Sequence, residues 1–147
     1  MIEQVYFYLD NTPGQLVEVL RMFAREGIDM RAYSVAENND YGVFRMIVRD
    51  PGAAVAALRR EGIDAAINHM LGIIAPDETG STVEAFQVLA DAGINVRYSY
   101  AFAQGSASMI PGAQGQDAFI LLRVDDNAKA EKVLKDAGVH LVNGQNF

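Results

Sequence analysis

The residue types best suited to hold a small ligand stand together near the start of the chain, in the order Asn11, Thr12, Pro13, Gly14, Gln15 and Leu16. They combine a turn with the start of a helical pattern, and the first N–H groups of a helix have no intrahelical acceptor. Because these groups also lie at the positive end of the helix dipole, the amides of Gly14, Gln15 and Leu16 can cradle a carboxylate. Gly14 lets a ligand approach the backbone, and Asn11 can bond either end of a zwitterion. The run predicts a binding site, with ordinary turn chemistry as the alternative.

A zwitterion also carries an ammonium group, and two polar side chains at predicted strand starts offer acceptors for it. Asp29 and Asn95 each follow an isoleucine, and the Asp29 carboxylate or the Asn95 Oδ1 atom can accept from an ammonium. A solvated strand end is the alternative for both. Arg31 and Arg97 recur two residues further on, where a salt bridge or packing on the sheet suits them as well as ligand binding does.

The side chains that catalysis requires are scattered along the chain. His69 and His140 stand alone, and cysteine is absent, which excludes thiolate metal sites and a thiol nucleophile. The sequence has no Ser-His-acid order, phosphate-binding loop or dinucleotide fingerprint. We therefore expect a protein that is not an enzyme and has neither a cofactor nor a metal site. His69 is expected on the link between two halves of the chain.

Composition narrows the possible partners. The chain has 147 residues, of which 50% are hydrophobic, and its 12 Lys and Arg against 19 Asp and Glu give a net charge of -7. The apolar content allows a sizeable core, and the lack of a basic patch argues against binding nucleic acid or anionic membranes. No apolar run approaches the ~20 residues that span a bilayer. The first residues lack the basic region of an export signal, so we expect a cytoplasmic protein.

The chain repeats itself. Residues 14–31 resemble residues 80–97 at an offset of 66, with seven identical pairs: Gly14/Gly80, Val17/Val83, Glu18/Glu84, Ala24/Ala90, Gly27/Gly93, Ile28/Ile94 and Arg31/Arg97. Further along, Val48 and Gly62 match Val124 and Gly138 at an offset of 76. An insertion at residues 104–116 explains the change, and it is interpreted either as a plain loop or as a lid or partner-docking arm. The repeat predicts two domains, at residues 1–70 and 71–147.

Each half has the same order of predicted elements, because period-two and helical patterns alternate in the same way. In the first half the strands are expected at residues 5–9, 28–36, 43–49 and 63–68. Its helices begin at Thr12, as N-cap before Pro13, and at Asp50, and they end at Gly27 and Gly62. In the second half the strands are expected at 70–75, 94–102, 118–124 and 139–143, and the helices at 80–92 and 127–137. The order β-α-β-β-α-β predicts an α+β fold of two ferredoxin-like units, each an antiparallel sheet with its helices on one face.

The alternation along the strands also assigns side chains to the two faces of each sheet. The helix-covered face is expected to hold Phe44, Met46, Val48, Ile120, Leu122 and Val124. The other face is expected to hold Tyr6, Tyr8, Tyr33, Ile47, Phe119 and Leu121. That second face is too apolar to stay exposed in a monomer. We therefore expect the two halves to pair with each other and the chain to form a homodimer.

The first turn resembles the ACT domain family, which has an Asn-x-Pro-Gly-x-Leu loop between its first strand and first helix. Asn11, Pro13, Gly14 and Leu16 match that loop. A Gly-x-Asn step opens the family's second strand, and Asn95 completes this step while Asp29 nearly does. The resemblance covers nearly the whole chain as two ACT-like units in tandem. It implies a regulatory module that binds a free amino acid at the junction of two units and does no chemistry itself.

In ACT pairs of the side-by-side kind the second strands are neighbours, which implies that residues 11–16 meet Asn95 and residues 77–82 meet Asp29. The second loop keeps Gly80 but has Asp77 and Glu78 where the first has asparagine and threonine. Acids there repel a carboxylate, so this site is empty, takes a more cationic ligand, or is only structural. The expected function is a sensor that binds a free amino acid. The alternative is a regulatory subunit that docks on an enzyme of amino-acid metabolism.

Overall fold

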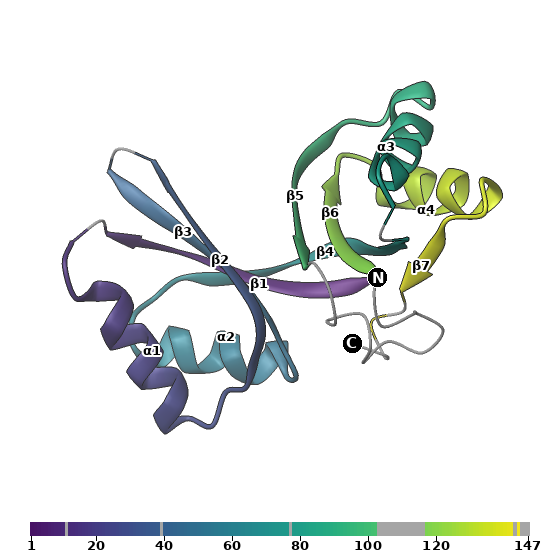
Figure 1. Cartoon of the computed structure of the whole chain (residues 1–147). Coiled ribbons are helices and arrows are strands. Elements are labelled where there is room, and N and C mark those ends of the chain that lie inside the picture. The colour runs from purple at the N-terminus through teal and green to yellow at the C-terminus, as the bar shows by residue number, and fades with distance from the viewer. Residues whose placement is uncertain (11, 39, 77, 103–116, 143, 145–147) are drawn as a thin grey trace. The chain divides into compact units, whose positions relative to one another are not determined.

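The structure is a computed structural model that describes the chain except for residues 11, 39, 77, 103–116, 143 and 145–147. The chain forms two compact units (Figure 1). We call Glu3–Asn68 the N-terminal unit, and Met1–Ile2 together with His69–Phe147 the C-terminal unit. The domain limits expected from the sequence, 1–70 and 71–147, stay a prediction.

The described residues form seven strands and four helices, and the fold is α+β as predicted. The elements up to the middle of the chain are β1 (Ile2–Asp10), α1 (Gln15–Arg25), β2 (Met30–Asn38), β3 (Tyr41–Val48), α2 (Pro51–Arg60) and β4 (Ala65–Ala75). Those that follow are α3 (Ser81–Asp91), β5 (Val96–Phe102), β6 (Ala118–Val124), α4 (Asn127–Asp136) and β7 (His140–Val142). The first part of β4 closes one β-α-β-β-α-β order and its second part opens the next.

In the N-terminal unit the strands follow the order β2-β3-β1-β4, and β3 pairs antiparallel with both β1 and β2. Phe7 of β1 lies opposite Phe44 of β3, and their rings stack with centroids 4.9 Å apart. Phe23 of α1 packs edge-on against Phe7 at 6.1 Å, and Leu58 of α2 belongs to the same buried cluster. Both helices therefore cover one face of this sheet, as the sequence predicts.

In the C-terminal unit β4 lies between β6 and β7, and β5 forms the outer edge beside β6. Leu89 of α3 and Leu134 of α4 are fully buried in one cluster with Ile120 and Leu122 of β6. The helix-side residues predicted in both halves are all buried: Phe44, Met46, Val48, Ile120, Leu122 and Val124. Their assignment to the core is confirmed.

The face predicted for Tyr33 is wrong. Tyr33 lies opposite Met46 and stacks on Phe44 at 5.7 Å, so it stands on the helix-covered face although its side chain is 58% exposed. The cause is a β-bulge, because the register shifts between Met30 and Ala32. One extra residue in a strand moves every later side chain to the opposite face.

The remaining outer-face assignments agree with the register. Tyr6 and Tyr8 lie opposite Arg45 and Val43, on the face away from Phe44. Tyr8 is exposed and Tyr6 half-buried, whereas three of the predicted outer residues are buried, namely Ile47, Phe119 and Leu121.

The boundary predicted between two strands near residue 69 is wrong, because β4 continues from Ala65 to Ala75. Nothing between residues 68 and 70 has the chemistry of a turn, so the two predicted strands join. His69 therefore lies within a strand, and its carbonyl accepts a hydrogen bond from Asn127 Nδ2 at 3.1 Å.

The helices of the two units begin and end with the same kinds of capping residues. The Asp50 and Asp126 carboxylates accept from the amides of Ala53 and Lys129, each at 2.9 Å, and so cap α2 and α4. Every helix ends at a glycine with positive φ, shown for α1 by the Ile28 amide bonding the Phe23 carbonyl at 2.9 Å. The predicted start at Asp50 and the predicted glycine ends are confirmed.

Candidate functional site

The loop between β1 and α1 is a tight turn closed by backbone hydrogen bonds. The Thr12 amide donates to the Asp10 carbonyl at 2.8 Å, and the Gln15 amide donates to the Thr12 carbonyl at 3.3 Å. Gly14 precedes the helix with φ 92° and ψ -22°, and no side chain caps the helix. Thr12 as N-cap and Pro13 as first helical residue are therefore wrong. The chain instead turns at a left-handed glycine, a conformation that a side chain would strain.

This turn leaves two backbone donors at the tip of α1. The Gln15 amide is already engaged, and the Glu18 amide donates to the Gly14 carbonyl at 3.1 Å. Within the described residues, no hydrogen bond is made by the amides of Leu16 and Val17. Both residues are exposed, so an anion can reach these donors and the positive end of the helix dipole.

The loop between β4 and α3 repeats the turn bond for bond. The Glu78 amide donates to the Pro76 carbonyl at 2.8 Å, and the Ser81 amide donates to the Glu78 carbonyl at 3.1 Å. Gly80 has φ 96°, close to the value at Gly14. The two tips differ in the amide that donates to the glycine carbonyl, which is the Val83 amide to Gly80 at 2.9 Å in the second loop and the Glu18 amide to Gly14 in the first.

The predicted acceptors Asp29 and Asn95 lie just before β2 and β5, and both are exposed. The backbone of Asn95 is fixed to Asp125. The Asn95 amide donates to the Asp125 carboxylate at 3.2 Å, and its carbonyl accepts from the Asp125 amide at 3.2 Å. The predicted residues Asn11 and Asp77 lie outside the described residues.

The recurring arginines mark a feature that the sequence did not reveal. In both units the strand register shifts at the same repeated position, between Met30 and Ala32 in β2 and between Val96 and Tyr98 in β5. The extra residue in each bulge is an exposed arginine, Arg31 or Arg97. In the sequence, the recurrence of arginine at this position was the only sign of the bulge, because a bulge has no residue pattern of its own.

In the N-terminal unit, the register of β1 and β2 on β3 places the loop after β1 far from the start of β2. Asp10, which leads into the first loop, lies opposite Tyr41, whereas Met30, next to Asp29, lies opposite Val48 at the other end of β3. Loop and strand start therefore lie at opposite ends of one sheet. A site that uses both has to combine two units, and the predicted meeting of residues 11–16 with Asn95 stays a prediction.

Among the residues that the structure describes, neither histidine belongs to a group of side chains that could hold a metal ion. Within the described part of the chain, no three His, Cys, Asp or Glu side chains are grouped so that they could hold a metal ion. No helix among those residues is long and apolar enough to cross a bilayer.

Comparison with known proteins relates the whole chain to one family. The family model of the ACT domain pair matches residues 1–147. A solved protein from Bacteroides thetaiotaomicron is similar over 99% of this chain and 94% of its own, with 30% identity and a TM-score of 0.86. The ligand-free regulatory subunit of aspartate kinase from Thermus thermophilus shares the fold over 99% and 92% of the two chains, with 18% identity and a TM-score of 0.59. A search of curated proteins gives no match.

Proposed function

Because the chain belongs to the ACT domain pair family, we propose that it binds a free amino acid at a junction between two ACT units. On this proposal it regulates by binding and does no chemistry itself. Its two domains are residues 1–70 and 71–147, it works in the cytoplasm, and two copies of the chain form a homodimer.

The observation that carries the proposal is the pair of free amides at the tip of α1. A carboxylate accepts hydrogen bonds from the Leu16 and Val17 amides, and Gly14 leaves room beside them because it has no side chain. Asn11, by its place in the sequence, adds a side-chain amide to this end of the ligand. Thr12, Pro13 and Gln15 shape the turn.

The ammonium group of the ligand is bound by the strand start of a second unit. Asn95 supplies an amide oxygen and Asp29 a carboxylate, both exposed. Since loop and strand start lie at opposite ends of each sheet, the ligand touches two units at once and favours the arrangement in which both contacts are made. Differential affinity of this kind shifts how units or chains pair, which is what regulation requires.

A second role, docking on an enzyme of amino-acid metabolism, is favoured by exposed apolar side chains of the N-terminal unit. Tyr8, Tyr33, Val35 and Tyr41 are between 39% and 58% exposed. Large exposed side chains of this kind are typical of protein interfaces. A structural relative is described as the regulatory subunit of aspartate kinase. Recovery of one enzyme in stoichiometric amount with the tagged protein supports this role, and recovery of none counts against it.

Calorimetric titration of the purified protein against each of the twenty amino acids tests the main proposal. We expect saturable binding of one amino acid or a small related group, and weaker binding by Asn11→Ala. The absence of binding at millimolar ligand, or an Asn11→Ala variant that binds as the wild type does, contradicts it.

A further inference from the structure

We propose that the amino acid bound by this protein carries a second anionic group on its side chain, and that Arg97 and Arg123 at the start of β5 bind this group. The inference rests on the amino-acid site proposed above and names the class of its ligand. Aspartate, glutamate and phosphorylated serine belong to this class. The two arginines then determine specificity, while Asn95 and the tip of α1 hold the α-amino and α-carboxylate groups.

A β-bulge brings the two arginines together. β5 pairs with β6 so that Val96 lies opposite Val124 and Tyr98 lies opposite Arg123. Arg97 is the extra residue between these two pairs, and a bulge sets two residues of one strand against one residue of the other. Arg97 and Arg123 are therefore neighbours on adjacent strands, where like charges are unfavourable. An anion between them offsets this repulsion, because it accepts hydrogen bonds from both.

Neither arginine is paired with a carboxylate of its own chain. Among the residues that the structure describes, the Arg97 side chain makes no hydrogen bond or ion pair, and Arg97 is exposed. Arg123 donates from Nη1 to the Val124 carbonyl at 2.8 Å and forms no ion pair with any described residue. Since a guanidinium group has five N–H donors, both arginines keep most of their donors for a ligand.

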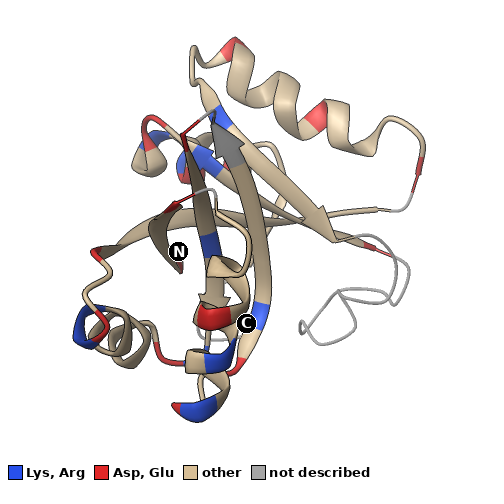
Figure 2. Cartoon of the chain, turned by 90° about the vertical axis from the view of Figure 1, so that its left-hand side faces the viewer, with Lys and Arg blue, Asp and Glu red and all other residues tan. Residues whose placement is uncertain are grey.

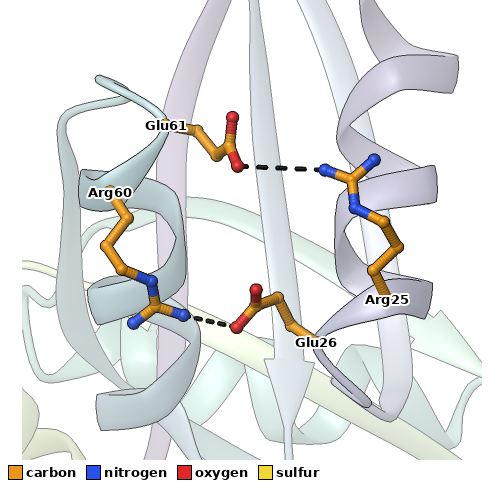
Figure 3. A network of polar contacts seen from close by, with 4 residues as sticks. All are labelled: Arg25, Glu26, Arg60 and Glu61. Atoms are coloured by element: carbon orange, nitrogen blue, oxygen red, sulfur yellow. Dashed lines mark hydrogen bonds and ion pairs between the residues drawn. The ribbon is translucent and has the colours of Figure 1, made fainter.

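The N-terminal unit shows how this chain uses arginine for structure. Arg25 pairs with Glu61 at 3.8 Å and Arg60 pairs with Glu26, so that two ion pairs join the end of α1 to the end of α2 (Figure 3). Each of these arginines has a carboxylate partner within its own unit. The arginines at the β5 bulge have none among the described residues, so a carboxylate or phosphate from outside the chain can take that place.

The other basic residues of the C-terminal unit lie elsewhere. They are three lysines of α4, whereas α3 carries acidic residues and no basic ones (Figure 2). Lys129 donates to the Ala92 carbonyl at 2.6 Å, and Lys132 pairs with Asp136 at 2.6 Å. The β5 bulge is therefore the place in this unit where two arginines meet, and a small anion is attracted there.

The residues beside the bulge suit the ammonium group of the same ligand. Asn95 lies two residues before Arg97, and its backbone is held by two hydrogen bonds to Asp125, each of 3.2 Å. Asp125 is exposed, so its carboxylate adds a negative charge next to the Asn95 side-chain oxygen. Because consecutive Cα atoms are about 3.8 Å apart, one small ligand can reach both Asn95 and Arg97. Acceptors followed by guanidinium groups match an ammonium followed by a side-chain anion.

The first unit lacks the second arginine. Its bulge has Arg31 as the extra residue, but Ala32 lies opposite Ile47, and Ile47 stands where the repeat has Arg123. A single arginine two residues after Asp29 offers an anion fewer donors and a nearby negative charge. Arg31 therefore provides a matched control, with the same residue type at the same place in the fold.

Titration of the full-length protein with matched pairs of amino acids tests this inference. Aspartate and asparagine, glutamate and glutamine, and phosphoserine and serine each differ in the charge of the side chain. We expect one anionic compound to bind at least about tenfold more tightly than its neutral counterpart, which is the effect of one charge-assisted hydrogen bond. Its affinity is expected to fall with added salt. The tightest of the three anionic compounds distinguishes a carboxylate from a phosphate.

Three variants assign the preference to residues. Arg97→Gln and Arg123→Gln are each expected to lower affinity for the anionic compound about tenfold and to leave the weaker affinity for its neutral counterpart unchanged. Arg31→Gln is expected to leave both affinities unchanged. Because Arg97 and Arg31 are both exposed bulge residues, Arg97→Gln and Arg31→Gln are expected to have equal melting temperatures.

Several results overturn the inference. If a neutral amino acid binds as tightly as its anionic counterpart, the inference is wrong and the amino-acid site still stands. Bulges and charged residues at a sheet edge also hinder pairing between chains. If this is all that Arg97 does, Arg97→Gln increases self-association and keeps the ligand preference, which also contradicts the inference. Absence of binding by every amino acid contradicts the proposed site itself, and the inference with it.

Discussion

Replacing Gly14 by alanine separates the ligand-binding role of this residue from its role in the fold. Gly14 has φ 92°, and a Cβ atom built there meets nothing within 4 Å, so the substitution causes strain without a steric clash. Holding a side chain in the left-handed region costs about 1–2 kcal/mol. In a protein of this size that lowers the melting temperature by roughly 2–8 °C.

Gly62 provides the matched control within the same unit. It has φ 76°, and a Cβ atom there also meets nothing within 4 Å, but it follows the end of α2 and does not belong to the start of α1. Gly62→Ala is therefore expected to lower the melting temperature by a similar amount. The two variants differ only in what the new methyl group faces.

Ligand affinity distinguishes the two variants. In Gly14→Ala the methyl group takes open space at the start of α1, where the carboxylate lies on our proposal, so the carboxylate is expected to lose at least one charge-assisted hydrogen bond. Such a bond is worth about 1.5–3 kcal/mol, which corresponds to a loss of affinity of about tenfold or more. Calorimetric titration and thermal unfolding measure both quantities. Equal amino-acid affinity in Gly14→Ala and Gly62→Ala, at equal loss of stability, refutes this reasoning.

Four further substitutions test the fold by urea unfolding. Phe44→Ala is expected to destabilise the N-terminal unit by about 3–5 kcal/mol, because it empties a fully buried aromatic site; a loss under 1 kcal/mol (far below the usual range) contradicts the packing. Asp50→Ala and Asp126→Ala each remove one helix cap and are expected to cost about 1 kcal/mol each, and unequal losses contradict the repeat. Gly72→Ala is expected to cost about 1–3 kcal/mol, because its Cβ atom would lie 2.9 Å from Phe119, and an unchanged midpoint contradicts this contact.

Much of the fold could be predicted because the sequence contains the same pattern of strands and helices twice. Strand alternation and helical spacing agree in both halves, and Asp50 and Asp126 mark helix starts by a local hydrogen bond that the residue type alone suggests. The resemblance to the ACT family also followed from the repeat. Gly14 and Asn95 belong to the two short family motifs, and these motifs occur at equivalent positions of the two halves. Local chemistry of this kind is readable without coordinates.

The errors arose where the residue types do not determine the backbone geometry. The bulge at Arg31 shifts the register of β2 and moves Tyr33 to the helix-covered face, and no residue type announces it. At the first turn, threonine followed by proline suggested an ordinary cap, but the chain turns at Gly14, so the free amides belong to Leu16 and Val17. The chemistry of the loop was predictable, while the identity of its donors depended on one backbone angle.

The most direct test of the central claim is an NMR titration of isotope-labelled protein with the amino acid that calorimetry identifies. We expect the amide signals of Leu16 and Val17 to shift with the same saturation curve as the side-chain amide of Asn95, because one ligand contacts both. Saturable binding that leaves the Leu16 and Val17 amides unshifted would contradict the claim that the tip of α1 holds the carboxylate.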